Sequence, residues 1–393
     1  MAQPTISFNR GQGGLGRPLA TNDHISGFIM PFVNANLPAG FSVSDRIKIV
    51  YSISEAETLG ITQAGTYTKL LWYHLNQFFK RQPLGKLYIH LIDSTAVTFA
   101  EVETLQNFSG GEIRQIGFYN VLSAFSTANL TTIQSSCTTL EGINKPVQVL
   151  YASNFQAITT IGSLADLRAL SCKNVSVVIG EDGDALGSAL AISEAKSVTC
   201  IGSALGVLSA SKVNENIGWI EKFNVVENGE FNEPALAIAS TTFLVKNQSQ
   251  SAMDGVSDKG YIFLNKQVGI DGTYFNDSPT AISVGSDYAY IENNRTIDKA
   301  IRNVRVFLLP SLNAPLYVNQ DGTLSEDVIS KFKNDCERAL ERMDIDGEIS
   351  DYKVIINPLQ DVLTTSKLSI AIKIVPVGVA REIEINIGFA VNV

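Results

Sequence analysis

Strand-like and helix-like runs alternate along residues 45–222, and this alternation limits the possible folds more than any other feature. Tyr67–Lys80 has apolar residues at helical spacing, and Lys86–Ile92 reads as a strand. The other expected strands are Gln115–Val121, Pro146–Tyr151 and Val175–Ile179, and the expected helices between them are Val102–Asn107, Leu130–Leu140 and Leu164–Leu170. Strands separated by helices of this length predict βαβ units in an α/β domain with a largely parallel sheet.

The sequence from residue 184 to the end predicts helices followed by two strands. Asp184–Ala210 is rich in Ala, Ser and Gly, which favours one or two closely packed helices. In the last third, Thr296 is a candidate N-cap for Ile297–Val306, and Ser325 is a candidate N-cap for a helix to Met343. Two strands follow: Leu368–Ile374, and Glu382–Val393 with apolar residues at every second position. This order predicts an α+β domain after the α/β domain.

The bulk properties are those of a folded chain of two or three domains. It has 393 residues, of which 45% are hydrophobic and 18% are charged, so disorder is not indicated. The net charge of −9 excludes a uniform basic surface for nucleic acid. We expect no signal peptide and no membrane insertion, because the N-terminus lacks a basic and apolar leader and the apolar runs are short. The four cysteines are scattered, which is typical of buried thiols in a reducing compartment.

Several motifs raise the question of an enzyme or a metal site. Gly11–Gly16 matches the GxGxxG pattern, but Arg17-Pro18 follows where a helix should begin, so a flexible hinge is the better interpretation. Gly180–Asp184 could hold a cation, although a solvated turn is the default. Two calcium-like fragments lack the full ligand set and are expected to be turns: Asn319–Gly322 and Asp344–Gly347. We therefore predict no catalytic, cofactor or metal site, with an enzyme carrying a doubly wound nucleotide-binding domain as an alternative.

An ordered set of short segments resembles a known family. The segments are Asp271–Asn276, Ser286–Tyr288, Asn294–Arg302, Val354–Val362, Leu368–Pro376 and Ile383–Phe389, with Gly14–Arg17 and Ser26-Gly27 near the start. Together they resemble the contractile tail sheath proteins of myophages, pyocins and extracellular injection systems, and the opening segments resemble the Mu-like branch. The resemblance is good over 271–393, suggestive over 1–30 and only architectural between them.

The resemblance implies a layout of five parts. These are an extended N-terminal arm (1–25), an outer α/β domain (26–230), an insertion or linker (231–270), an inner α+β sheath domain (271–376) and a C-terminal strand arm (377–393). Sheath subunits lend terminal strands to their neighbours. A strand with an unpaired edge suits this role, since a monomer would normally protect it. The candidate arm residues are Thr5, Ile6, Phe8, Ile383, Ile385, Ile387, Phe389 and Val391.

The implied function is mechanical. Subunits would form a helical homo-oligomer, as stacked rings, around an inner tail tube and would contract to drive the tube through a target envelope. The implied partners are the tube, baseplate and tail terminator proteins, with assembly in the bacterial cytoplasm and a final place in a virion tail or released particle. The candidate tube-facing residues lie on the helix after Ser325: Lys331, Lys333, Arg338 and Arg342. Another tail or baseplate component is a further alternative.

Overall fold

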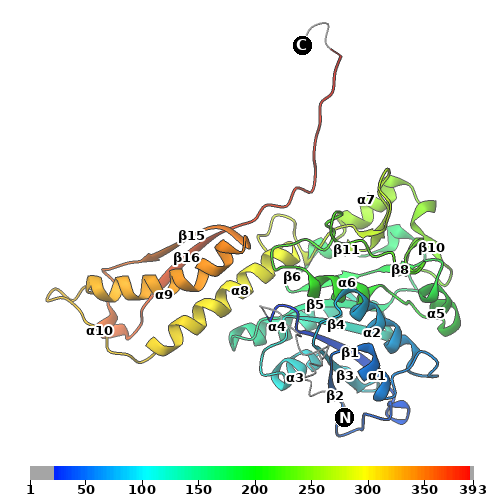
Figure 1. Ribbon diagram of the computed structural model, residues 1–393, viewed down its shortest axis with the longest axis horizontal. Helices are drawn as coiled ribbons and strands as arrows, with labels where there is room; N and C mark the ends of the chain where they lie inside the picture. The colour runs from blue at the N-terminus through cyan, green and yellow to red at the C-terminus, as the bar shows by residue number, and fades with distance from the viewer. Residues whose placement is uncertain (1–21, 390–393) are drawn as a thin grey trace, which may run out of the picture.

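The computed structural model describes residues 22–389, and a seven-stranded sheet forms the centre of its larger part (Figure 1). The strand order is β11-β7-β5-β4-β1-β3-β2. Every neighbouring pair is parallel except β2 with β3, which confirms the mostly parallel sheet. Its strands are β1 (Ser26–Phe32), β2 (Ile47–Val50), β3 (Leu87–Asp93), β4 (Gln115–Ala124), β5 (Gln148–Asn154), β7 (Val175–Val178) and β11 (Tyr261–Ile262).

Helices cover this sheet, and those from α2 to α6 lie in segments that the sequence predicts as helical, whereas α1 and α7 were not predicted. They are α1 (Ile53–Thr58), α2 (Lys69–Arg81), α3 (Glu101–Phe108), α4 (Thr127–Gly142), α5 (Leu186–Glu194), α6 (Ile201–Ala210) and α7 (Gln250–Asp258). The predicted helix at Leu164–Leu170 is wrong, because that segment forms only short 3-10 turns. The 3-10 turns of the described chain are Asn34–Asn36, Ile161–Ser163, Leu167–Ala169, Val245–Asn247 and Leu309–Ser311.

Helices α2 and α6 pack closely, as their small residues predict. A Cβ atom added to Gly202 of α6 would lie 2.3 Å from the carbonyl oxygen of His74, and one added to Gly206 would lie 2.7 Å from that of Phe78. Both contacts are with the backbone of α2, which cannot yield as a flexible side chain can. Glycine is therefore required where the two helices touch.

Residues 231–282 belong to the α/β body, which differs from the predicted insertion at 231–270. β11 lies beside β7 in the central sheet, although residues 231–270 were expected to lie outside it. The remaining short strands also pair within the body: β6 (Ser171–Cys172) with β14 (Ala281–Ile282), β8 (Gly180–Asp182) with β9 (Pro234–Leu236), β9 with β10 (Phe243–Leu244), and β12 (Leu264–Asn265) with β13 (Tyr274–Phe275). The part of the chain that lies outside the α/β body accordingly begins near residue 291, with α8.

Two long helices and a β-hairpin project from this body (Figure 1). They are α8 (Ile291–Leu308), α9 (Glu326–Ile345), β15 (Ile349–Ile356) and β16 (Ile370–Pro376), with the short α10 (Val362–Thr365) between the two strands. The Ser325 hydroxyl accepts a hydrogen bond from the Val328 backbone N–H, which confirms the predicted N-cap of α9. Helix α8 begins six residues before the predicted Ile297, so Thr296 lies inside it.

The segment that follows β16 leaves the body as a single extended chain (Figure 1). Residues 377–389 form neither a helix nor a strand. The predicted strand at Glu382–Val393 is therefore absent from the described part of that segment. The physical reason is that a β-strand needs a hydrogen-bonded neighbour, and no other segment lies beside this one. Among residues 22–389, no helix is both long and apolar enough to cross a membrane.

Candidate functional site

The candidate arm residues at the C-terminal end are fully open to solvent. Ile383, Ile385, Ile387 and Phe389 are 76%, 71%, 92% and 110% exposed. A run of large apolar side chains such as this one is unusual on a free surface. Four other predicted arm residues lie outside the described residues, as does the Gly11–Gly16 hinge: Thr5, Ile6, Phe8 and Val391.

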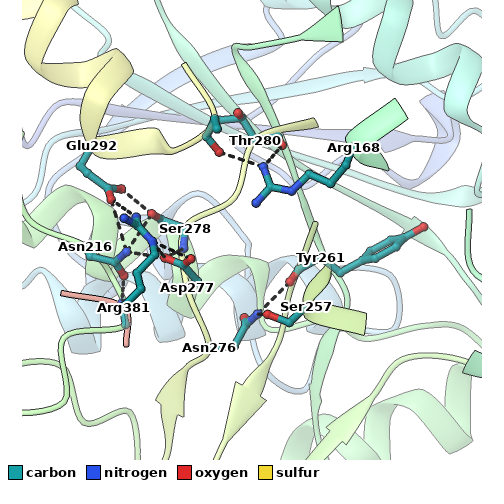
Figure 2. A network of polar contacts seen from close by, with 12 residues as sticks. Arg168, Asn216, Ser257, Tyr261, Asn276, Asp277, Ser278, Thr280, Glu292 and Arg381 are labelled. Atoms are coloured by element: carbon teal, nitrogen blue, oxygen red, sulfur yellow. Dashed lines mark hydrogen bonds and ion pairs between the residues drawn. The ribbon is translucent and has the colours of Figure 1, made fainter. Parts of the chain in front are cut away.

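Arg381 fastens the start of this exposed segment to the body (Figure 2). Its Nε donates to Asp277, with 2.9 Å between Nε and Oδ2, and its NH2 group donates to Glu292. The guanidinium also covers the ring of Tyr290, with 3.4 Å between its central carbon and the ring centroid. Arg381 thus contacts a carboxylate of the α/β body, a carboxylate of the first turn of α8 and an aromatic ring. We call these four residues the Arg381 clamp.

A buried polar network supports the two carboxylates of the clamp (Figure 2). The Asn216 amide donates to Asp277 Oδ1 at 2.5 Å and to Ser278 Oγ at 3.1 Å, and the Ser278 hydroxyl donates to Glu292. Glu292 is only 2% exposed. Burial raises the pKa of its carboxyl above the usual range, and the Ser278 hydrogen bond and the Arg381 charge oppose that rise. Arg381 is therefore the cation that compensates a buried acid.

Arg168 holds the loop that carries the clamp. One of its terminal nitrogens donates to three backbone carbonyls, those of Thr280 at 3.1 Å, Ile282 at 3.2 Å and Ala289 at 3.0 Å (Figure 2). The Asn276 amide donates to the Ser257 hydroxyl and the Tyr261 carbonyl. These bonds tie residues 276–290 to the α/β body. The clamp is consequently built on a fixed support.

A second charged cluster lies where the described chain begins. Asp23 and Glu348 are buried, and the Lys299 ammonium nitrogen lies 2.7 Å from Asp23 Oδ2 and 2.6 Å from Glu348 Oε1. Arg302 approaches the other Asp23 oxygen at 3.7 Å. The Gln115 amide of β4 donates to the Asp23 carbonyl at 2.9 Å. Asp23, next to the N-terminal segment, is thus held by cations of α8, and Arg381, next to the C-terminal segment, by Asp277 and Glu292.

An apolar groove of about 480 Å³ lies between α8 and β16. Ile372 and Ile374 of β16 form one side of it, and Ile301 of α8 is 47% exposed within it. β16 pairs only with β15 in the described chain, so its other edge is open. The lining residues are Asn144, Ile297, Ala300, Ile301, Val304, Arg305, Leu308, Leu309, Leu312, Ile372 and Ile374. The two-stranded sheet leaves part of the apolar face of α8 uncovered.

The four candidate tube-facing residues all lie exposed on α9, opposite its buried stripe. Lys333 lies 3.7 Å from Glu337, and the Arg342 Nε lies 2.7 Å from Asp346. Lys331 lies over the ring of Phe332 and Arg338 over that of Phe307. These four basic side chains are therefore accessible on the surface of α9.

The acidic residues at Gly180–Asp184 have a local structural role. The Asp182 carboxylate accepts hydrogen bonds from the backbone N–H groups of Gly187 at 3.0 Å and Phe231 at 3.1 Å. Similarly, Asp321 accepts a bond from the Thr323 backbone within its turn. Across the described residues, no group of three or more His, Cys, Asp or Glu side chains has an arrangement that could hold a metal ion.

Comparisons with known proteins agree with this architecture. Two profiles of one family match the sequence: "DUF2586, N-terminal domain" over residues 3–279 and "DUF2586, C-terminal domain" over residues 287–393. A search of curated proteins gave no match. The boundary between the two profiles falls close to the start of α8, where the chain leaves the α/β body for the two long helices and the hairpin.

Similar solved structures come from contractile injection systems. A chain of the helical sheath of the anti-feeding prophage in its contracted state has a TM-score of 0.63 at 15% identity, with 100% of both chains covered. A chain of the contracted PVC sheath complex, from an extracellular contractile injection system, has a TM-score of 0.61 at 12% identity, covering 100% of this chain and 98% of the other. A chain of the anti-feeding prophage baseplate has a TM-score of 0.61 at 15% identity, covering 99% of both. The fold is therefore one that sheath assemblies use.

Proposed function

The chain belongs to the DUF2586 family, and we propose that it is the structural subunit of a contractile sheath. In this role it polymerises helically around an inner tube by lending terminal strands to neighbouring copies. No cofactor and no catalytic step is required. The similarity of fold to sheath chains supports this assignment.

One observation carries the proposal: the exposed segment and the open groove are complementary. Ile383, Ile385 and Ile387 occupy every second position of an extended segment, so in a strand they share one face. The groove offers an open strand edge beside an apolar helix face. A strand paired with that edge of β16 would satisfy its backbone groups and bury its isoleucines against α8.

The donor and the acceptor belong to different copies in this proposal. The segment leaves the Arg381 clamp and runs away from the body, whereas the groove lies along α8 (Figure 1). Because donor and acceptor surfaces differ, the contact is heterologous and propagates as a helix instead of closing a dimer. Repeated strand donation would connect the inner layers into one mesh, with the α/β bodies outside it.

The remaining parts fit a mechanical cycle. We propose that α9 presents Lys331, Lys333, Arg338 and Arg342 to the tube, since weak complementary charge allows reversible contact. Baseplate and tail terminator proteins would bind the two ends of the sheath. Contraction would repack rigid bodies while the strand links hold. Subunits would assemble in the bacterial cytoplasm and act in a virion tail or a released particle.

Negative-stain electron microscopy of the purified full chain tests the proposal. We expect wide hollow tubes with a regular helical repeat. Discrete particles at every concentration, with or without a tube protein, would contradict the assignment. An enzyme with a nucleotide-binding domain would give discrete particles, so the same images separate the two classes.

A further inference from the structure

We propose that Arg381 is a positioning residue for strand donation: the Arg381 clamp fixes the direction in which the C-terminal segment leaves the subunit before any neighbour binds it. The inference rests on the proposed function, because it concerns the segment that would be donated. It assigns a role to Arg381, Asp277, Glu292 and Tyr290 that is separate from the pairing of the strand itself.

The clamp divides the chain after β16 into two parts. Up to Pro376 the chain is held in the hairpin, where the Pro376 carbonyl accepts a bond from the Ser350 hydroxyl at 3.1 Å. The next four residues, Val-Gly-Val-Ala at 377–380, make no hydrogen bond to the described chain. Arg381 then returns to the body, and residues 382–389 again make no such bond. Arg381 is therefore the last attachment before the exposed segment.

The contacts of Arg381 come from three directions, which is why they fix an orientation. Asp277 and Glu292 take two edges of the planar guanidinium, and Tyr290 covers one of its faces. A single exposed ion pair would leave the side chain free to rotate and would contribute little. Here the Glu292 carboxylate is buried and the guanidinium donors lie in one plane, so the orientation of the Arg381 side chain is restrained. A lysine at this position would keep the positive charge. It would lose the paired N–H donors that reach two carboxylates and the planar group that stacks on Tyr290.

Restraint at Arg381 moves the start of the free segment from residue 377 to residue 382. A binding segment that is ordered in advance loses less conformational freedom on association. The clamp should therefore lower the protein concentration needed for assembly. Because Asp277 lies on the α/β body and Glu292 on α8, the clamp also sets the segment's direction relative to both parts of the subunit.

Distances between two spin labels on the unassembled chain test the clamp directly. The four native cysteines are buried, so labels can be placed on introduced cysteines at the exposed positions Ser135 of α4 and Asn386. The protein is kept below the concentration at which tubes form. We expect one narrow distance distribution for the otherwise native chain and a broad one for Arg381→Ala, with Arg381→Lys between them. Lys246→Ala is the matched control, since it removes a cation paired with a carboxylate at 3.0 Å elsewhere on the α/β body, and it should leave the distribution narrow.

A second variant separates positioning from folding. Arg381→Ala leaves Glu292 buried without its cation, which could destabilise the fold. Glu292→Gln combined with Arg381→Ala removes both charges and keeps an amide beside Ser278. This double variant should melt close to the native chain and still show the broad distribution. Narrow distributions in both Arg381→Ala variants, or a broad one in the native chain, would overturn the proposal.

Assembly gives the second measurement. We expect Arg381→Ala to raise the concentration at which half of the chain sediments as tubes by about tenfold, or about 1.4 kcal/mol, and Lys246→Ala to leave it unchanged. An unchanged concentration for Arg381→Ala would contradict a role in donation. If the native chain forms no tubes, the proposed function fails, while the distance measurement still decides whether Arg381 orients the segment.

Discussion

Lys299 joins helix α8 to the first described turn of the chain, with 2.7 Å between its ammonium nitrogen and Oδ2 of Asp23. The same ammonium lies 2.6 Å from Oε1 of Glu348, which immediately precedes β15. One cation of α8 therefore holds a residue before β1 and a residue before the hairpin. All three groups are largely buried, so the cluster depends on having its full set of partners.

Replacing Lys299 with alanine should destabilise the subunit by about 3 kcal/mol, because it removes the nearest cation from two buried carboxylates. Chemical denaturation followed by tryptophan fluorescence measures the change. Lys333→Ala is the matched control: its pair with Glu337 is exposed and should change the free energy of unfolding by less than about 0.5 kcal/mol. Equal, small effects of the two substitutions would show that the cluster does not hold the layers together.

The same cluster predicts a loss of stability in acid. Burial alone would raise the pKa of Asp23, but Lys299, Arg295 and Arg302 outweigh it and lower that pKa below 3.8. A carboxylate with a lowered pKa stabilises the fold above its unfolded-state pKa and loses that contribution as pH falls through the folded-state value. Stability should therefore decline below about pH 4, and Asp23→Asn should flatten this decline in denaturation curves recorded from pH 6 to pH 2. A decline of unchanged steepness in Asp23→Asn would contradict the role given to this carboxylate.

Removing residues 382–393 while keeping Arg381 should leave a folded subunit that forms no tubes. Residues 382–389 make no hydrogen bond to the rest of the described chain, and their side chains are exposed, so the melting temperature should stay within about 1 °C, which is roughly the shift that 1 kcal/mol produces in a chain of this length. Scanning calorimetry and sedimentation measure the two properties. Ordered tubes from the shortened chain would refute strand donation by this segment.

A charge in the groove should block assembly without unfolding the subunit. Ile301 is 47% exposed in the free groove, so Ile301→Asp costs the monomer little. If a donated strand covers this position, the new carboxylate would be buried without a partner. Val306→Asp is the control, since Val306 lies on the same helix, is 65% exposed and does not line the groove. We expect tubes from Val306→Asp and none from Ile301→Asp; tubes from both would place the acceptor elsewhere.

Reversing Lys331, Lys333, Arg338 and Arg342 to glutamate should leave tube-free polymerisation intact and abolish co-assembly with the inner tube. All four are exposed on α9, so their exchange should cost little stability. Co-sedimentation with preformed tubes at low and high salt measures the effect, because complementary surface charge is screened by salt. Lys246→Glu with Lys266→Glu, both exposed on the α/β body, is the control. Salt-independent co-assembly of the reversed variant would show that another surface faces the tube.

The sequence predicts the elements whose signals are local. Helix α9 has both an N-cap at Ser325 and a continuous apolar stripe, and the structure agrees with the predicted start. Helix α8 begins six residues before its predicted start, because its first turns bury polar groups such as Glu292 and Arg295, whose partners lie on other elements. Hydrophobic periodicity does not indicate that Arg295 is buried, because its hydrogen bond to Ser211 exists only in the folded chain.

Features that depend on distant pairing escape sequence analysis. β11 is only two residues long and was assigned to an insertion, although it pairs with β7 in the central sheet. The clamp was missed because Arg381 lies 89 residues after Glu292 and 104 after Asp277. The exposed isoleucines, by contrast, follow from their alternation alone. Whether they pair with a neighbour is a property of the assembly, and it stays a prediction.

Helical reconstruction of the assembled chain by cryo-electron microscopy tests strand donation most directly. The prediction is that residues 383–389 of one subunit form a strand beside β16 of another, with Ile383, Ile385 and Ile387 against α8. Arg381 should remain on Asp277 and Glu292 of its own subunit. A map in which the segment folds onto its own body, or in which the outer edge of β16 is unpaired within an ordered tube, would contradict the account.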